Sequence, residues 1–566
     1  DGRARQPVPD PRLLLCDFHL REVDHAAFGA AFGRDAQPRK VSIMTNILIG
    51  VGGTGAKIVE AILVMASAGL GPSELTVGLV DQDGSNGNVQ RTRHLLETMV
   101  AFRNEWSPGQ ATNAVNWRAA NAPAIGRCRV SPLFVEPRGN ALWMPNQGQT
   151  SLHAMIGQNL PDVQRDLFNM LFMDNGDEQK LDLGKGYRGR AHVGSAAFVA
   201  ALADQDNAFL TRMAALMNDP ARRQVNIFIA GSAFGGTGAA GFPTLARTLN
   251  RMRQDPTIAN GGNVKLGGLL MLPYFTFGEI DETEQSAVSP DELMPKAKMA
   301  LEYYDNLFTH ERTFERFYIS GWQNFISLGE GKDGGPEQAN PPLPAEIFAA
   351  TSAFDFFDHD FSAQSDDALA SGKVPSVLMS RTGGPLLWQD FPNSETTLDA
   401  IGQLIRFAAY WLYLVEPQLR VKDSIFAPNW AYRLAEKASI EESEPVLARL
   451  RGLCYHILSW ASTVEHMGSR AGRNAEWGQG LWSLEPLLSR THQATRIQPV
   501  ALSGPLDRAQ FMQIFNQLIR FDDQSPVTRA GDSIYAELSA KGLDVPGEHR
   551  GIGRVVAAAY QSVRVR

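Results

Sequence analysis

Two glycine-rich stretches carry residue types that suit phosphate binding. The first reads GVGGTGAK at residues 50–57, directly after an apolar run and directly before a helix-length segment. Glycine tolerates positive φ and lets backbone N–H groups approach an anion, and a helix that begins near Gly55 directs the positive end of its dipole at that anion. A helix end contributes only about 0.3–1 kcal/mol at an exposed site, so several N–H groups must act together. The candidate phosphate-binding residues of this loop are Gly50, Gly52, Gly53, Thr54 and Gly55.

The second stretch, AGSAFGGTGAAG at residues 230–241, repeats the arrangement, with a strand-like run before it and a helix-like run after it. Two phosphate-sized turns in one domain are more than a dinucleotide fold needs, because a Rossmann dehydrogenase or an adenylating enzyme uses only the first. The candidate residues of this loop are Gly231, Gly235, Gly236, Thr237 and Gly238.

The first loop alone leaves three interpretations open. Gly50, Gly52 and Gly55 match GxGxxG, and Asp81 stands at the end of the next apolar run, where a dinucleotide-binding fold places its ribose-binding acid. The same residues suit an adenylating enzyme, and they also suit a tight turn that lets a helix pack closely. The loop is not a P-loop, because Lys57 stands one residue too late for GxxxxGK and no Ser or Thr follows it.

Short apolar runs alternate with helix-length segments around both loops. This alternation predicts βαβ units, and therefore a parallel sheet with right-handed crossovers. Strands are expected at 46–50, 75–80, 224–231, 264–275 and 314–321, and helices at 55–68, 239–253, 289–309 and 345–358.

The pattern also predicts how the chain is divided. Residues 1–43 are rich in Arg, Asp, His and Pro and stop just before Met44, so we expect a disordered leader. Beyond residue 395 the strand signals largely vanish, while apolar residues recur at helical spacing. The expected parts are a nucleotide-binding domain at 44–360 with an insertion at about 88–180 beside the sheet, a linker or irregular segment at 361–394, and a mainly helical region at 395–566.

Composition excludes some classes of partner. The net charge of −8 supplies no sequence-independent attraction for nucleic-acid phosphates, which would require a basic face. The three cysteines lie far apart without CxxC spacing, which predicts neither a disulfide framework nor a zinc cluster. No uninterrupted run of 18 apolar residues occurs, so we expect no membrane span, and a cytoplasmic location fits best.

The paired loops resemble those of the tubulin and FtsZ superfamily. Members of that family carry a first loop of the form GxGGxG and a later signature near GGGTGSG, and here GVGGTGAK and AFGGTGAAGFP are similar to them. The resemblance covers residues 44 to about 360. It implies a Rossmann-like, mostly parallel sheet with helices on both faces, and a prokaryotic, GTP- or GDP-binding protein. It also implies that residues 235–238 cradle phosphates, with the Thr237 hydroxyl as an additional donor.

Further residues follow from the resemblance. Asp81 and Asp83 stand where the family has an acidic loop, which implies an approach to the phosphates through Mg²⁺, a cation that prefers carboxylate and water oxygens. Arg188 and Arg190 stand in a stretch similar to another phosphate loop of the family, where each could pair with phosphate oxygens. Asn324 could contact the guanine edge.

The resemblance also bears on hydrolysis and assembly. In polymerising relatives an acidic residue after the core helix acts on the nucleotide of the next subunit, and Asp358 and Asp360 stand in roughly that region. The resemblance thus implies a GTPase that self-associates into filaments or acts with protein partners. The alternatives are a Rossmann-type enzyme that uses NAD or forms an adenylate, and a scaffold that binds nucleotide without hydrolysis.

Overall fold

The computed structural model describes most of the chain from Met44 onward, and the leader predicted at 1–43 lies outside the described residues. The described residues are 44–106, 113–119, 122–134, 140–172, 178–204, 206–278, 290–322, 326–330, 334–361, 376–381, 386–420, 429–436, 438–470, 481–482, 488–489, 498–499, 538 and 549–564.

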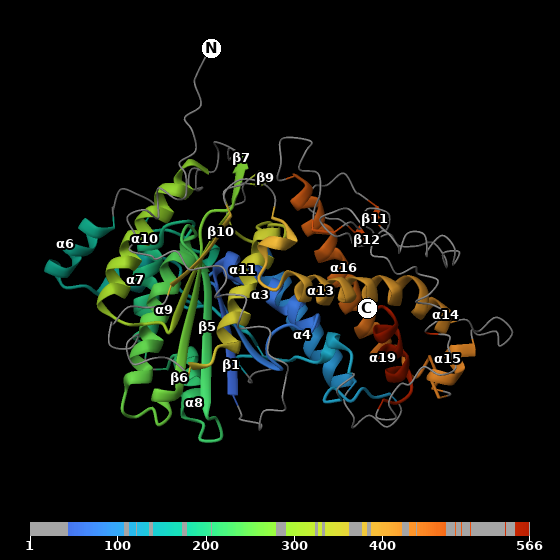
Figure 1. Ribbon diagram of the computed structural model, residues 1–566. Helices are drawn as coiled ribbons and strands as arrows, with labels where there is room; N and C mark the ends of the chain where they lie inside the picture. Colours follow the sequence, from blue (N-terminus) through green and yellow to red (C-terminus); the bar gives the residue numbers. More distant parts are fainter. Residues whose placement is uncertain are drawn as a thin grey trace, which may run out of the picture.

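A parallel sheet forms the centre of the molecule (Figure 1). Its strands follow the order β10-β8-β6-β5-β1-β2-β3, and the short β4 also pairs with β2. The inner strands are continuous apolar runs because helices cover both faces of the sheet. The fold class predicted from the sequence is therefore confirmed. The strands are β1 (Met44–Val51), β2 (Glu74–Val80), β3 (Arg129–Pro132), β4 (Leu142–Trp143), β5 (Gln224–Ser232), β6 (Val264–Met271), β8 (Arg316–Trp322) and β10 (Ser376–Arg381).

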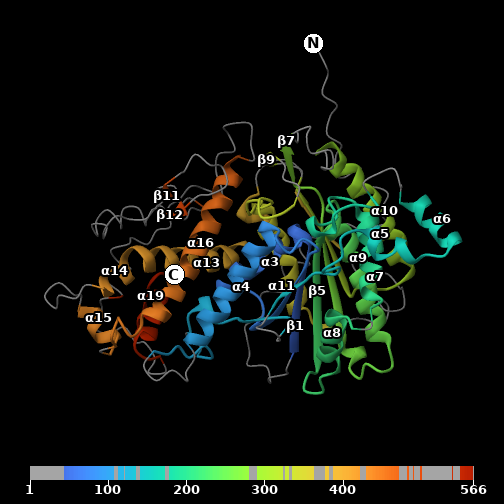
Figure 2. The ribbon, with the colours of Figure 1, turned by 180° about the vertical axis from the view of Figure 1, so that it is seen from behind.

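The chain leaves the two central strands in opposite directions. From β1 it passes through α3 (Gly52–Ser67) to β2, and from β5 it passes through α9 (Gly236–Gln254) to β6 on the other side. Because both crossovers are right-handed, α3 and α9 cover opposite faces (Figures 1 and 2). The carboxyl ends of the neighbouring strands β1 and β5 thus form a topological switch point, the place where open α/β sheets bind ligands.

Further helices lie on each face of the sheet, beside α3 on one face and beside α9 on the other. The α3 layer includes α4 (Gly87–Glu105) and α11 (Pro344–Asp358), and the α9 layer includes α7 (Ala191–Leu202) and α10 (Leu293–His310). The remaining elements of this region are α5 (Leu152–Met155), α6 (Asp162–Leu171), α8 (Ala208–Asn218) and a parallel pair, β7 (Phe275–Gly278) and β9 (Ile326–Glu330).

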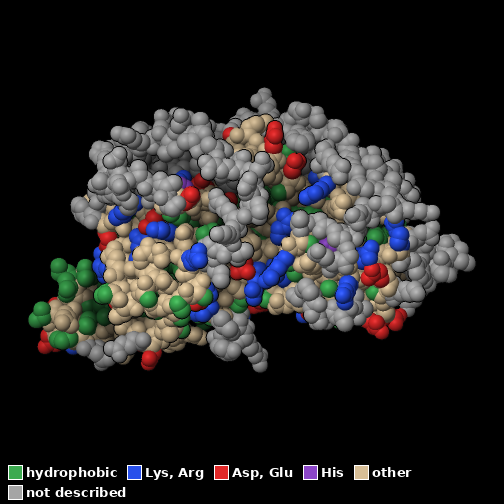
Figure 3. Space-filling model, turned by 60° about the horizontal axis from the view of Figure 1, so that its bottom comes forward, with side chains coloured by type: hydrophobic (Ala, Val, Ile, Leu, Met, Phe, Trp, Pro, Cys, Tyr) green, Lys and Arg blue, Asp and Glu red, His purple; other side chains and the backbone are tan. Residues whose placement is uncertain are grey.

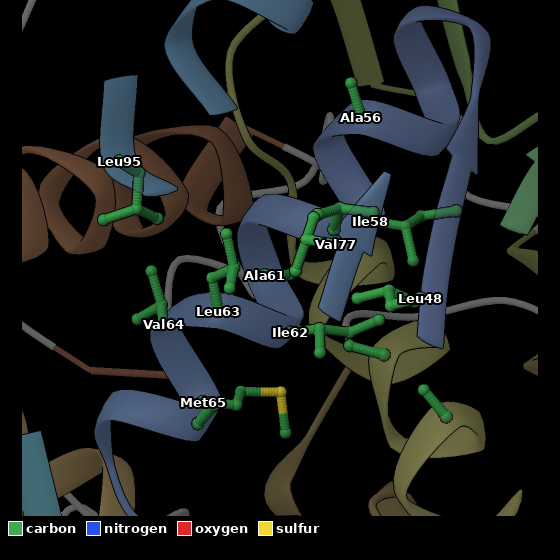
Figure 4. Packing of buried hydrophobic residues seen from close by; sticks show 14 of the residues in the cluster. Leu48, Ala56, Ile58, Ala61, Ile62, Leu63, Val64, Met65, Val77 and Leu95 are labelled. Carbon is green, nitrogen blue, oxygen red and sulfur yellow. The ribbon is translucent and has the colours of Figure 1, made fainter. Parts of the chain in front are cut away.

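Helix α3 is apolar on nearly every side because neighbours surround it. Figure 4 shows Ile58 and Ile62 directed at Leu48 and Val77 of the sheet, and all four side chains are fully buried. Each such side chain contributes about 1.5–3 kcal/mol on burial. This packing holds the first glycine loop, which forms the start of α3, in a fixed position.

Two segments differ from the sequence prediction. Residues 88–180 were expected as an insertion beside the sheet, but they supply β3 and β4 to it, and most of α4. Residues 361–394 were expected to be irregular, but they supply the edge strand β10, which pairs in parallel with β8. Strands of two to six residues are too short to show a clear period, so their pairing could not be foreseen.

The described residues after 394 are mainly helical, as predicted. Helix α13 (Ser394–Tyr410) runs through a π-helical turn (Trp411–Val415) into α14 (Glu416–Leu419). Helix α16 (Glu444–Arg470) packs against α4. It also contacts α3, because its His456 lies 3.2 Å from the carboxylate of Glu60. None of the described helices is long and apolar enough to cross a membrane. The other elements are α15 (Asn429–Leu434), α19 (Ile552–Ser562) and an antiparallel pair, β11 (Leu488–Ser489) and β12 (Gln498–Pro499).

Candidate functional site

Both glycine loops open into one cleft at the topological switch point. The volume of the cleft, together with the open solvent at its mouth, is ≈ 1110 Å³. Ten of its lining residues were predicted as ligand-binding from the sequence: Gly52, Gly53, Thr54, Asp81, Asp83, Arg188, Gly235, Gly236, Thr237 and Gly238.

The two loops touch each other across the cleft floor. Gly52 has φ +75°, and a Cβ on it would lie 3.0 Å from the backbone nitrogen of Gly238. A Cβ on Gly236 would lie 2.8 Å from the nitrogen of Gly189, in the loop before α7. Three backbone segments therefore meet closely here, which only glycine permits.

Three predicted glycines have a packing role instead. A Cβ on Gly55 would lie 2.6 Å from the carbonyl oxygen of Ala230, and one on Gly50 would lie 2.8 Å from the Gly55 oxygen. A Cβ on Gly231 would lie 3.3 Å from Phe242 of α9. None of these three lines the cleft. They let α3 and α9 pack closely on the strands, which was one of the interpretations left open for the first loop.

The N-termini of α3 and α9 both face the cleft without protein caps. Neither helix has a side-chain cap or an acidic residue in its first turn within the described structure. By contrast, Asn86 caps α4 by accepting from the backbone nitrogens of Asn88 and Val89. The first N–H groups of a helix need a partner. At α3 and α9 an anion in the cleft could be that partner.

The acidic turn after β2 is tied to the second loop. Thr237 donates from Oγ1 to Asp81 Oδ1 at 3.1 Å. Asp83 accepts from the backbone nitrogen of Gly335 at 2.6 Å. Asp81 is 3% exposed, and this burial, together with the nearby Asp83, raises the pKa of Asp81 to about 7 despite the hydrogen bonds it accepts. A cation placed beside Asp81 would favour its charged form.

Asn88 was not predicted from the sequence, and it lines the same cleft. It is 2% exposed, yet its Oδ1 has no hydrogen-bond partner among the described residues. A buried polar atom without a partner costs roughly 1–3 kcal/mol. A donor supplied by a ligand, or by water bound to a cation, would remove that cost.

Lys57 also lines the cleft, but its ammonium group is already paired. It lies 2.5 Å from Glu346 Oε1, and Tyr274 donates to the same oxygen at 2.5 Å. Burial lowers the pKa of Lys57, and Glu346 opposes this effect. The pair fastens α3 to the start of α11. Its partner lies in a distant helix, so no local pattern could have predicted this pair.

Some of the other cationic residues line the cleft and others lie outside it. Arg188, which has φ +43°, and Lys185 line the cleft. Arg190, predicted as a phosphate ligand with Arg188, does not line it, and instead precedes the first residue of α7. Phosphate contact in the present arrangement is thus available to Arg188 rather than to both.

Part of the cleft lining is apolar. It consists of Phe234, Phe275, Phe277, Leu293 and Leu328. Phe234 directly precedes Gly235 of the second loop, and it packs edge-on against Phe275, with ring centroids 5.6 Å apart. The cleft therefore combines backbone and polar groups with apolar side chains that could cover a flat ring.

The predicted catalytic acids lie far from this cleft. Helix α11 begins beside Lys57 and runs for 15 residues to Asp358, a length of about 20 Å. Asp358 and Asp360 are exposed at its distal end, near the amino end of β8, where Asp355 pairs with Arg316. They therefore do not reach the cleft of their own chain. Asn324, predicted to contact the base, lies outside the described residues.

No family model, curated protein or solved structure matches the chain. The described residues contain no group of three or more His, Cys, Asp or Glu side chains that could hold a metal ion by themselves. Asp81 and Asp83 nevertheless suit Mg²⁺, which proteins commonly bind through one or two carboxylates together with substrate phosphates.

Proposed function

We propose that this chain is a tubulin-like protein that binds GTP or GDP, with the phosphates between its two glycine loops. The observation that carries the proposal is the convergence of both loops, from β1 and β5, on one cleft at the switch point. In this proposal the uncapped N-termini of α3 and α9 bind the phosphate oxygens. Asp81 and Asp83 would hold Mg²⁺, which would supply positive charge beside the phosphates.

A Rossmann-type enzyme is the main alternative. It would use Asp81 to bind ribose and would have no need of the second loop. The hydrogen bond from Thr237 to Asp81 favours the first proposal, because it directs that carboxylate toward the second loop.

Hydrolysis in this proposal depends on self-association. Asp358 and Asp360 lie about 20 Å from the cleft of their own chain, so an acid there would orient water on the nucleotide of a neighbouring chain. Turnover per molecule should then rise with protein concentration. A scaffold that does not hydrolyse nucleotide would show no turnover at any concentration.

The test begins with the nucleotide that accompanies the purified protein. The protein is denatured, the released nucleotide is identified by chromatography and mass spectrometry, and the emptied protein is titrated with GTP, GDP, ATP and NAD. We expect a guanine nucleotide, bound more tightly with Mg²⁺ than without. Preferential binding of NAD or ATP would contradict the proposal.

A further inference from the structure

Helix α6 presents an apolar face to solvent at one edge of the molecule. Val163 is 82% exposed, Leu167 55%, Met170 81% and Leu171 61%. Figure 3 shows this cluster as the largest gathering of hydrophobic side chains on the face it displays, and Figures 1 and 2 place α6 at the periphery of the molecule. None of the α6 residues lines the cleft.

The opposite side of α6 fixes how that face is presented. Phe168 is buried, and its ring lies 5.2 Å from that of Phe172, which in turn stacks on His192 at the start of α7. Asn169 accepts a hydrogen bond from Gln179 at 3.1 Å. The exposed residues recur at i, i+4, i+7 and i+8, so they share one side of an anchored helix.

The exposed side chains together present on the order of 400 Å² of apolar surface, a size that marks interaction sites on monomers. Two such faces in contact would bury on the order of 800 Å², about half of a standard interface. The contact would therefore be modest and dependent on concentration.

The charges beside this face suit a second copy of the chain better than a membrane. Asp162, Arg165 and Asp166 carry both signs and sum to −1, whereas helices that lie on membranes are rich in Lys and Arg. In a two-fold contact the two surfaces are copies of the same patch. Arg165 lies 3.3 Å from Asp162 of its own helix, so two patches of low net charge would come together.

We propose that α6 is a contact surface through which two copies of this chain associate in a two-fold arrangement. No residue of α6 lines the cleft. The contact therefore differs from the one that would bring Asp358 or Asp360 to the cleft of a neighbouring chain, and it does not rest on nucleotide binding.

The test measures self-association of the full chain by sedimentation velocity, from about 1 to 100 μM, a range that spans weak dimers. The variant Leu167→Asp/Met170→Asp places two charges in the apolar face. Its matched control, Met299→Asp/Tyr303→Asp, places two charges at exposed apolar positions of α10. We expect dimers for the wild type and the control, and at least tenfold weaker association for the α6 variant.

A cross-link tests proximity directly. Leu167→Cys should form a covalent dimer on mild oxidation, and Met299→Cys should not. The proposal is overturned if the wild type stays monomeric throughout the range, if the α6 variant associates as strongly as the control, or if both cysteine variants cross-link equally. Binding of the monomeric wild type to lipid vesicles, with loss in the α6 variant, would assign the face to membranes instead.

Discussion

Thr237 donates a hydrogen bond to Asp81 across 3.1 Å, and so joins the second glycine loop to the turn after β2. Thr237 lies in the first turn of α9, and Asp81 follows the strand that neighbours β1. The two loops and the acidic turn thus form one connected wall. Removing either partner should affect the cleft more than the rest of the fold.

The variant Thr237→Val keeps the shape of the side chain and removes the donor. A hydrogen bond to a charged group is worth about 1.5–3 kcal/mol, so we expect nucleotide affinity with Mg²⁺ to fall roughly 10- to 100-fold. Calorimetric titration measures it. Thr244→Val is the control, because the Thr244 hydroxyl donates to a carbonyl oxygen of its own helix, that of Ala240. Equal affinities for the two variants would show that the hydroxyl has no role in binding.

The raised pKa of Asp81 predicts a pH dependence of stability. An unfolded Asp loses its proton near its ordinary pKa of 3.8, whereas folded Asp81 keeps its proton until about pH 7. Between these values the folded state binds more protons, so the free energy of unfolding falls as pH rises, by at most about 1.4 kcal/mol per unit.

The variant Asp81→Asn cannot titrate and should lack this contribution. In denaturant unfolding of nucleotide-free protein, its stability relative to the wild type should therefore increase from pH 4.5 to 7, then level off. Asp305→Asn, the same substitution at an exposed position on α10, is the matched control. A constant difference for Asp81→Asn would mean that Asp81 is not protonated in the folded state.

The buried pair of Lys57 and Glu346 predicts a strong coupling. Removing one partner leaves an uncompensated buried charge, so Lys57→Met and Glu346→Gln should each destabilise the protein by about 3–5 kcal/mol. The double variant should lose less than the sum, by about 1–3 kcal/mol. Denaturant unfolding measures the cycle. Lys185→Met, at an exposed position in the cleft, should change stability by about 0.5 kcal/mol or less. Additive effects would refute the pairing.

The sequence allowed the glycine loops and the sheet class to be predicted because their requirements are local. The glycines of each loop and the apolar runs before them can be recognised within ten residues. The contribution of residues 88–180 to the sheet, and the strand β10, could not be predicted, because pairing of short strands depends on distant partners.

The same distinction applies to the site. The pairing of Lys57 with Glu346 and the partnerless oxygen of Asn88 arise only when remote segments come together. Among the predicted glycines, Gly50, Gly55 and Gly231 serve packing. A motif cannot distinguish a glycine that approaches a ligand from one that approaches a helix.

Gly52 offers a way to separate strain from binding. A side chain at positive φ costs about 1–2 kcal/mol, and Gly148 has φ +84° with no atom within 4 Å of an added Cβ. Gly52→Ala and Gly148→Ala should therefore lose similar stability from backbone strain. Only Gly52→Ala should also weaken nucleotide binding, because its methyl group would press on Gly238 in the second loop. Equal affinity in both variants would mean that the junction of the loops does not bind ligand.

The most direct test of the central claim compares Gly235→Asp with Gly235→Asn. Gly235 has φ −88°, and an added Cβ meets only the Ser232 hydroxyl, at 3.0 Å. Both substitutes are favourable residues before a helix and have the same shape, so the difference between them isolates one negative charge.

Two unit charges about 4 Å apart repel by about 4 kcal/mol at an effective dielectric of 20, and solvent reduces this. We predict that Gly235→Asp binds GTP at least tenfold more weakly than Gly235→Asn, measured by titration at equal ionic strength. Equal affinities would contradict the account, because they would place the nucleotide phosphates away from the second loop.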